Sequence, residues 1–229
     1  MRSDRVELSV ERTETPQLIL AIESAIAGGS LSLLDGTGRE IANWVGGDAD
    51  VARAEDLLIN IDGLLSSVGV SKRDLALIAV SAGPGSFTGI RIGMATALGL
   101  KKGLSIPMCS ASVLHSIVIA KGYLAPGPSN WVYYAGVPSG RNAIALQAFE
   151  VGEWSQKELA APVTIKDSDL STFICDAPDF HFFLHAELVE TLGASGRVTD
   201  VGRNLAECVA IDCFANRRLT EPLFISKSF

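Results

Sequence analysis

A glycine-rich stretch that leads from an apolar segment into an expected helix places the strongest constraint on the fold of this 229-residue chain. The apolar segment Leu75–Ser81 has the length and the flanking turn residues of a buried strand. The loop Gly83–Gly89 follows and reads GPGSFTG. Its glycines and its proline allow a sharp turn and a close approach of another backbone or of a ligand. The sequence therefore predicts a strand, a tight loop and a helix in direct succession.

The expected helix extends to about residue 102 and carries a ridge of small residues. Gly89, Gly93 and Ala97 recur at every fourth position and therefore share one face. Glycine inside a helix costs roughly 1 kcal/mol relative to alanine, so the ridge requires a compensating interaction. The sequence is compatible with two compensating interactions. One is close packing of a second helix, and the other is an anion bound at the helix N-terminus, with Arg91 nearby.

The composition predicts a cytoplasmic protein with a sizeable core. Hydrophobic residues make up 48% of the chain, and a chain of this length buries roughly 70% of its unfolded surface. No apolar run approaches the ~20 residues of a membrane-spanning helix. The charged segment 1–17 lacks the apolar centre of a signal peptide, so we expect a loosely attached N-terminal extension. The four cysteines show no CxxC spacing and lie in apolar contexts, which favours reduced, buried thiols.

The charge balance argues against independent nucleic-acid binding. The chain has 19 Lys and Arg against 26 Asp and Glu, a formal net charge of −7. Proteins that bind nucleic acids contact the phosphates with clustered Lys and Arg. Any role on a nucleic acid would therefore require a partner that supplies the basic surface.

The hydrophobic pattern predicts one domain at residues 18–121 in which strands and helices follow in the order βββαβαβα. We expect strands at 18–24, 30–35, about 40–45, 75–81 and about 106–109, and helices at 49–69, 88–102 and 111–121. Three antiparallel strands followed by alternating helices and strands favour an α/β fold, with a mixed sheet and helices on its faces.

A Pro- and Gly-rich stretch at residues 122–130 predicts the start of a second, smaller domain at 122–202. In this domain we expect two paired strands at 131–137 and 142–150, a short strand at 173–176 and a helix at 181–192. After the domain, we expect a longer helix at 203–219 that packs back on the first domain.

The stretch Val80–Ser112 closely resembles the signature of the bacterial tRNA threonylcarbamoyladenosine biosynthesis proteins TsaB, also called YeaZ, which typically read GPGSFTGLRIG at this loop. Leu18–Gly36 is similar to the opening strand, turn and second strand of that family. The resemblance covers residues 18 to about 120 and is weak beyond Gly122. It implies a fold of the actin, sugar-kinase and Hsp70 type, with two RNase-H-like halves of which the second is degenerate.

The resemblance also implies a function. Members of the family are non-catalytic subunits that pair with the catalytic subunit TsaD and, together with the ATPase TsaE, support transfer of a threonylcarbamoyl group to adenosine 37 of tRNA. It implies that this chain meets tRNA only within the complex and has no cofactor of its own, with ATP or ADP at the partner interface. In isolation, we expect the chain to form a homodimer.

Dimerisation in the family uses the helices that match 49–69 and 88–102. We assign to this interface Leu57, Ile61, Leu64, Gly89, Ile90, Gly93, Met94 and Ala97. The Gly93→Leu substitution is then expected to abolish the complex and to leave the monomer folded. A secondary ligand loop is assigned to Gly83, Gly85, Ser86, Thr88 and Arg91. The competing interpretation of this loop is a turn that serves packing alone.

Departures from the family pattern argue against chemistry by the chain itself. Glu23 and Ser24 stand where an Asp-Thr pair is usual, and the glycine loop lacks the lysine of a Walker A motif. We therefore predict no catalytic residue and no metal site. The alternative is a sugar-kinase-like or glycoprotease-like enzyme that depends on a metal or a nucleotide. For such an enzyme, His181 and His185 have the spacing of two metal ligands on one helix.

Overall fold

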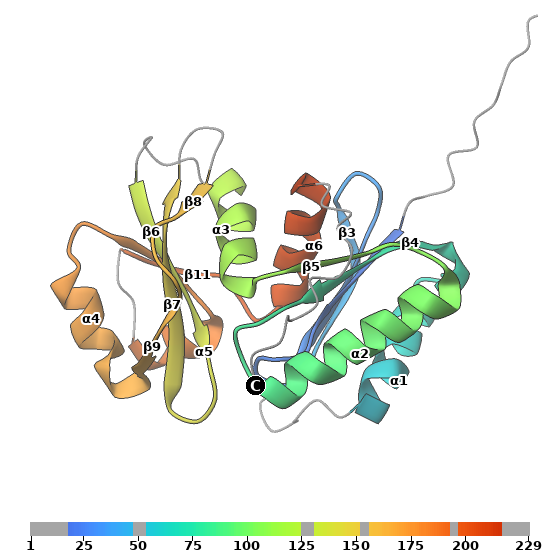
Figure 1. The fold of residues 1–229 in the computed structure, drawn as a ribbon, viewed down its shortest axis with the longest axis horizontal. Helices are drawn as coiled ribbons and strands as arrows, with labels where there is room; N and C mark the ends of the chain where they lie inside the picture. The colour runs from blue at the N-terminus through green and yellow to red at the C-terminus, as the bar shows by residue number, and fades with distance from the viewer. Residues whose placement is uncertain (1–17, 48–53, 125–130, 152–155, 193–196, 217–229) are drawn as a thin grey trace, which may run out of the picture.

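The structure is a computed structural model that describes residues 18–47, 54–124, 131–151, 156–192 and 197–216. In these residues the chain forms two β-sheets, with helices on their outer faces and between them (Figure 1). The expected N-terminal extension at 1–17 lies outside the described residues. No helix within the described ranges combines the length and the apolar character that crossing a bilayer demands.

The first sheet has the strand order β3-β2-β1-β4-β5. β1 pairs antiparallel with β2 and β2 with β3, whereas β4 is parallel to both β1 and β5. The turn between β1 and β2 contains Gly28 and Gly29, whose positive φ angles suit a tight hairpin. The strands span Leu18–Glu23 (β1), Ser30–Leu34 (β2), Glu40–Val45 (β3), Leu75–Ser81 (β4) and Met108–Ala111 (β5).

The second sheet repeats this order in reduced form, as β11-β10-β6-β7-β8, with β9 also paired to β7. β6 and β7 form an antiparallel hairpin, and β10 is parallel to β6 and β11. Where the first sheet has β3 beside β2, the second sheet has two short strands, β8 and β9, which both pair with β7. The strands span Trp131–Pro138 (β6), Ala143–Val151 (β7), Gln156–Glu158 (β8), Val163–Lys166 (β9), His181–Leu184 (β10) and Val198–Asp200 (β11).

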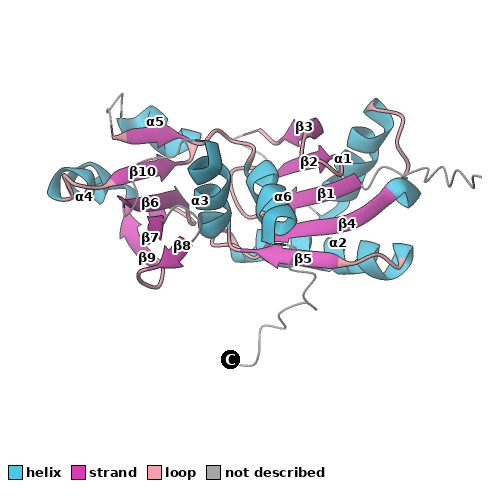
Figure 2. Ribbon diagram, turned by 90° about the horizontal axis from the view of Figure 1, so that it is seen from above, coloured by secondary structure: helices cyan, strands magenta, loops and turns pink. Residues whose placement is uncertain are grey.

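The helices form an outer layer on each side and a central layer between the sheets (Figure 2). α1 and α2 cover the outer face of the first sheet, and α4 and α5 lie on the far side of the second. The helices span Ala54–Ser67 (α1), Phe87–Leu104 (α2), Val113–Leu124 (α3), Leu170–Asp176 (α4), Ala186–Leu192 (α5) and Leu205–Asn216 (α6).

The two central helices exchange places between the halves. α3 follows the first sheet in the chain but contacts β6, β7 and β10 of the second. α6 ends the described chain and lies on β1, β2, β4 and β5 of the first sheet, next to α3. The largest apolar cluster is therefore shared by both halves, with members such as Ile19, Val118, Phe149 and Val209.

Two local predictions in the second half are wrong. Residues 173–176 belong to α4 rather than to a strand. Residues 181–192 form strand β10 and then helix α5, with His185 between them. Phe182, Phe183 and Leu184 are all buried, because the sheet is covered on both faces, and such a continuous apolar run does not distinguish a strand from a buried helix.

The expectation of four reduced, buried thiols is also wrong. Cys109 and Cys213 form a disulfide whose Cα atoms lie 6.0 Å apart, and Cys175 is exposed. Only Cys208 is a free, buried thiol among the described residues. Composition cannot reveal the pair, because its members are 104 residues apart and meet only when α6 returns to the first sheet.

Candidate functional site

The glycine loop is anchored to the turn between β1 and β2. The backbone N–H of Ser86 donates to the carbonyl oxygen of Ala25 at 2.7 Å. A Cβ atom on Gly85 would lie only 2.7 Å from the Cβ of Ala25. Gly83 and Gly85 have φ angles of +90° and +150°, which favour glycine. The loop therefore needs glycine both for its shape and for its contact with the first hairpin.

Two backbone N–H groups that an anion could use at this loop are already paired within the chain. One is the Ser86 N–H just described, and the other is the Gly89 N–H, which donates to Ser86 Oγ at 3.3 Å and so caps α2. Arg91 is exposed, and its guanidinium carbon lies 3.8 Å from the centre of the Phe87 ring. The ligand loop at Gly83, Gly85, Ser86, Thr88 and Arg91 stays a prediction.

The small-residue ridge of α2 faces into the chain. A Cβ atom on Gly89 would overlap the carbonyl oxygen of Ser24, and one on Gly93 would overlap Ser24 Oγ. Ala97 is fully buried. The expectation that this ridge is kept for a partner is therefore wrong, because the end of β1 occupies it. Gly93→Leu should accordingly disrupt the monomer rather than leave it folded.

The other residues assigned to the interface also pack inside the chain. Leu57, Ile61 and Leu64 are buried between α1 and the first sheet. Ile90 and Met94 are partly buried against the two cores that flank this sheet. Dimerisation through these helices stays a prediction, but it requires the residues that point away from the sheet.

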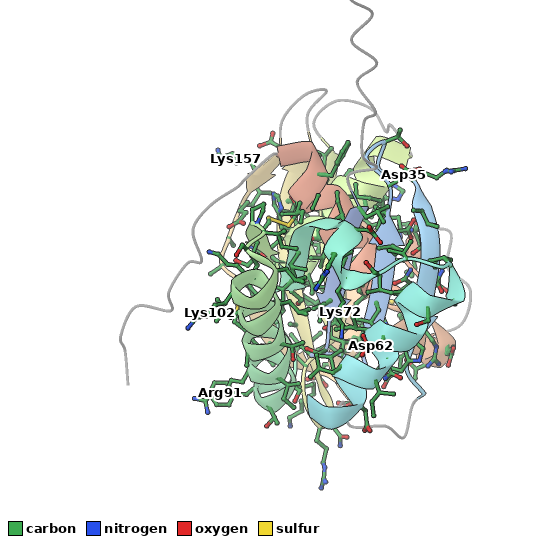
Figure 3. All side chains as sticks on the ribbon, turned by 90° about the vertical axis from the view of Figure 1, so that its right-hand side faces the viewer. Asp35, Asp62, Lys72, Arg91, Lys102 and Lys157 are labelled. Carbon is green, nitrogen blue, oxygen red and sulfur yellow. A yellow bond between two sulfur atoms is a disulfide. The ribbon has the colours of Figure 1, made fainter. Side chains whose placement is uncertain are left out.

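Those residues form what we call the outer helix face, the solvent side of α1 and α2. Large apolar side chains are exposed there: Ile59 (68%), Phe87 (60%), Leu58 (45%) and Leu98 (39%). Figure 3 views the molecule from this side, with α1 and α2 next to each other. Because several large apolar side chains are exposed on two neighbouring helices, this face is a candidate protein interaction site.

Three glycines on these helices have no role within the monomer. A Cβ atom on Gly63, Gly99 or Gly103 would meet no atom within 4 Å. Each glycine nevertheless carries the cost of a flexible residue in a helix, roughly 0.5–1 kcal/mol relative to alanine. The buried ridge explains Gly89 and Gly93, whereas packing within the described residues does not explain these three.

Charged side chains also lie on and beside the outer helix face. Lys72 forms an ion pair with Asp62 of α1, and Arg91 and Lys102 project from α2 (Figure 3). Specific protein interfaces combine exposed apolar side chains with polar and charged ones. The arrangement therefore favours binding of a protein over binding of a small molecule.

Glu23, which closes β1, is a buried carboxyl group. Its Oε1 accepts the backbone N–H of Ala25 at 2.6 Å. Burial raises its pKa to about 8, and hydrogen bonds from the Ala25 and Ile26 backbone only partly oppose this shift. At neutral pH the side chain is therefore largely protonated and anchors the turn that holds the glycine loop.

The two histidines considered as metal ligands do not share a helix. His181 begins β10, and His185 follows that strand as a buried residue whose Nδ1 accepts the Glu187 N–H at 3.4 Å. The described residues contain no group of three or more His, Cys, Asp or Glu side chains placed to hold a metal ion.

Sequence reasoning missed a buried polar cluster between the two central helices. Nδ1 of His115 on α3 lies 2.8 Å from Oδ2 of Asp212 on α6, and Ser116 Oγ donates to the same oxygen at 2.9 Å. The serine contacts the carboxylate rather than the imidazole, so the cluster is not a Ser-His-Asp triad. It joins the helices that connect the two halves.

Sequence reasoning also missed the outer helix face, although a signal was present. Leu57, Leu58 and Ile59 are consecutive, and one face of a helix cannot bury three residues in a row. Only Leu57 is buried, and the next two are exposed. The helix therefore has more apolar residues than the face on the sheet can bury, and this excess indicated a second contact on its other side.

Comparison with known proteins identifies relatives of this chain. The family model described as TsaD, tRNA N6-adenosine threonylcarbamoyltransferase, matches residues 48–169, which is more than half of the chain. The tRNA threonylcarbamoyladenosine biosynthesis protein TsaB of Escherichia coli is 41% identical over 58 residues, 25% of each chain. TsaB of Bacillus subtilis is 28% identical over 151 residues, 59% of this chain and 60% of that protein. The match thus spans less than two thirds of either relative.

Solved structures confirm the expected fold class. YeaZ from Pseudomonas aeruginosa superimposes with a TM-score of 0.61 at 18% identity, over 88% of this chain and 93% of that one. A putative N-acetylmannosamine kinase from Listeria monocytogenes gives a TM-score of 0.52 at 13% identity, over 88% and 99%. The chain therefore has the α/β fold that YeaZ and this sugar kinase share.

Proposed function

This chain belongs to the family whose model is described as TsaD, tRNA N6-adenosine threonylcarbamoyltransferase, and we propose from its similarity to relatives named TsaB that it is a TsaB-like (YeaZ-like) member. It acts in the biosynthesis of threonylcarbamoyladenosine in tRNA, as a cytoplasmic, non-catalytic subunit that binds a TsaD-like catalytic subunit. A TsaE-like ATPase completes the complex, and tRNA is bound only through it.

The outer helix face is the observation that carries this proposal. Its exposed apolar side chains and its glycines without a role in the monomer fit a helical partner that packs closely on α1 and α2. The TsaD family model matches from residue 48 onward and so includes both helices. A partner from the same family would present a similar pair, and two such pairs can pack against each other. A second copy of this chain could occupy the same face in isolation.

The partner also explains where a nucleotide would act. The proposed complex has no cofactor site on this chain alone, and ATP or ADP binds at the boundary with the partner. Two of the N–H groups at the glycine loop are paired within the chain, which leaves the loop poorly equipped to hold a triphosphate by itself.

Charge substitutions on the outer helix face test the proposal. Ile59→Glu combined with Leu98→Glu places one carboxylate on the exposed side of each helix, where binding of the partner would have to desolvate it. We expect the affinity for a purified TsaD-like subunit, measured by isothermal titration calorimetry, to fall at least about 100-fold. Far-UV circular dichroism should be unchanged because both side chains are exposed.

Leu159→Glu is the matched control. Leu159 is 44% exposed, close to the value for Leu98, but it follows β8 in the other half of the molecule. Its substitution should leave the affinity within about twofold of the native chain. Equal binding by the double variant and the native chain would contradict the proposed interface.

Titration of the isolated chain with ATP and Mg²⁺ distinguishes the subunit from the enzyme alternative. A sugar-kinase-like or metal-dependent enzyme requires stoichiometric binding of a nucleotide or metal without a partner. We expect no saturable heat up to millimolar ATP. Tight one-to-one binding, or a metal that copurifies in stoichiometric amount, would favour the enzyme.

A further inference from the structure

The disulfide between Cys109 and Cys213 links the end of the described chain to the first half. Cys109 lies on β5 at the edge of the first sheet, and Cys213 lies on α6. The loop that the bond closes contains α3 and the whole second sheet, because 104 residues separate its two ends. The bond thus fixes α6 covalently to the sheet that this helix covers.

The bond is enclosed by apolar side chains in the folded state. Both cysteines are 3% exposed and belong to the cluster shared by the two halves. A thiolate must reach one of the sulfur atoms to open a disulfide, so reduction requires the surroundings to open first.

The required opening is short, because Cys213 lies near the end of α6. The described helix ends at Asn216, and the residues between them, Phe214 and Ala215, are exposed. Unwinding about one turn would therefore lift the end of α6 that carries Cys213 away from the sheet without separating the two halves. Such local openings need much less free energy than global unfolding.

The preceding residue limits how far the helix unwinds. Asp212 is buried and binds His115 and Ser116 of α3 through one carboxylate oxygen. Unwinding beyond this point would break both contacts and expose a buried carboxylate. The last turn of α6, residues 213–216, can therefore open while residues 205–212 stay in place.

The other two cysteines are poor competitors for this bond. Burial raises the pKa of the Cys208 thiol to about 12, so this residue stays protonated and unreactive. Cys175 is exposed on α4, on the far side of the second sheet. Pairing is thus directed to Cys109 and Cys213.

We propose that the bond between Cys109 and Cys213 is a reversible redox clamp that opens while the protein stays folded. In reduction, two molecules of a low-molecular-weight thiol supply two electrons and two protons. The Sγ–Sγ bond breaks, Cys109 and Cys213 become thiols, and the two reductant molecules join in one disulfide. An oxidised low-molecular-weight disulfide reverses the step. Reduction frees the last turn of α6 and loosens its hold on the first sheet.

Thiol trapping on the native full-length chain tests the clamp. Protein purified without reductant, then unfolded and treated with iodoacetamide, should gain two alkyl groups by mass spectrometry, at Cys175 and Cys208. After incubation of the folded protein with a millimolar thiol it should gain four, with an unchanged far-UV spectrum. Amide hydrogen exchange at residues 213–216 should speed up at least about tenfold, and exchange at 205–212 should not change.

The reduced chain should also unfold at a temperature lower by roughly 5–15 °C, because the closed loop is long. Cys213→Ser should unfold at the temperature of the reduced chain, and the exposed control Cys175→Ser at that of the oxidised chain. Four alkyl groups before reduction, a bond that resists the thiol until the protein unfolds, or loss of the fold on reduction would each overturn the proposal.

Discussion

The end of β1 shows how single side chains determine the position of an entire helix. Ser24 Oγ donates to the Gly89 carbonyl at 2.8 Å, and Glu23 holds the following turn through the backbone N–H of Ala25. Both side chains are buried. A serine and a protonated glutamate thus fasten α2 to the sheet through neutral hydrogen bonds, without a charge in the core.

The raised pKa of Glu23 makes stability depend on pH. Its folded value of about 8 exceeds the ordinary value of 4.5, so folding takes up a proton between these values. The contribution of this group is complete below pH 4.5 and is lost as pH rises through 8. We expect the free energy of unfolding, measured with urea, to fall by a few kcal/mol between pH 5 and pH 9.

Glu23→Gln keeps the shape of the protonated side chain and removes its titration. The variant should lose most of this decline and be more stable than the native chain at pH 9. Glu158→Gln, at an exposed position on β8, should decline as the native chain does. If the free energy of unfolding fell equally between pH 5 and pH 9 in the native chain and in Glu23→Gln, a group other than Glu23 would control the pH dependence.

Among the elements, α2 carries two classes of glycine that sequence alone does not separate. Gly89 touches the end of β1, whereas Gly99 faces open space. The repeat at every fourth residue correctly predicted one shared face for Gly89, Gly93 and Ala97. It could not predict what covers that face, because this depends on where the chain places Ser24.

A matched pair of substitutions in α2 tests this division. Gly89→Ala should lower the free energy of unfolding by roughly 1–3 kcal/mol, because the new Cβ overlaps the Ser24 backbone. Gly99→Ala should raise it by about 0.5–1 kcal/mol through helix propensity. Urea unfolding of both variants at one pH gives the comparison. The same sign for both would contradict the inward orientation of the ridge.

Sequence patterns predicted the first half closely and the second half poorly, for a physical reason. β3 and β4 begin and end where the alternation and the apolar run place them. These segments have distinct periods and are bounded by glycine or polar turns. The second half has short elements, such as β11 with three residues, which are too short to show a period. Residues 181–184 are buried on both sides and read equally as strand or helix.

For the complete chain, the exchange of α3 and α6 makes the two halves depend on each other. α6 supplies Leu205, Val209 and Cys213 to the apolar cluster on the first sheet. Without these side chains, that face of the sheet would expose residues such as Ile19 and Leu34 to water. We therefore expect one cooperative unfolding transition rather than one for each half.

Truncation tests this dependence. A chain that ends at residue 203 lacks α6 and should lose cooperative thermal unfolding and gain binding of a hydrophobic dye. A chain that ends at residue 216 keeps α6 and should unfold cooperatively. If the shorter chain also gave a sharp transition with native circular dichroism, the first half would be independent of α6.

The position of α6 has a consequence for synthesis on the ribosome. Domains commonly fold as they emerge, with the N-terminal part first. Here α6, which lies on the inner face of the first sheet, is translated nearly 100 residues after β5. The nascent first half therefore emerges before residues 205–216, and the apolar surface that α6 covers is exposed to water until that helix is made.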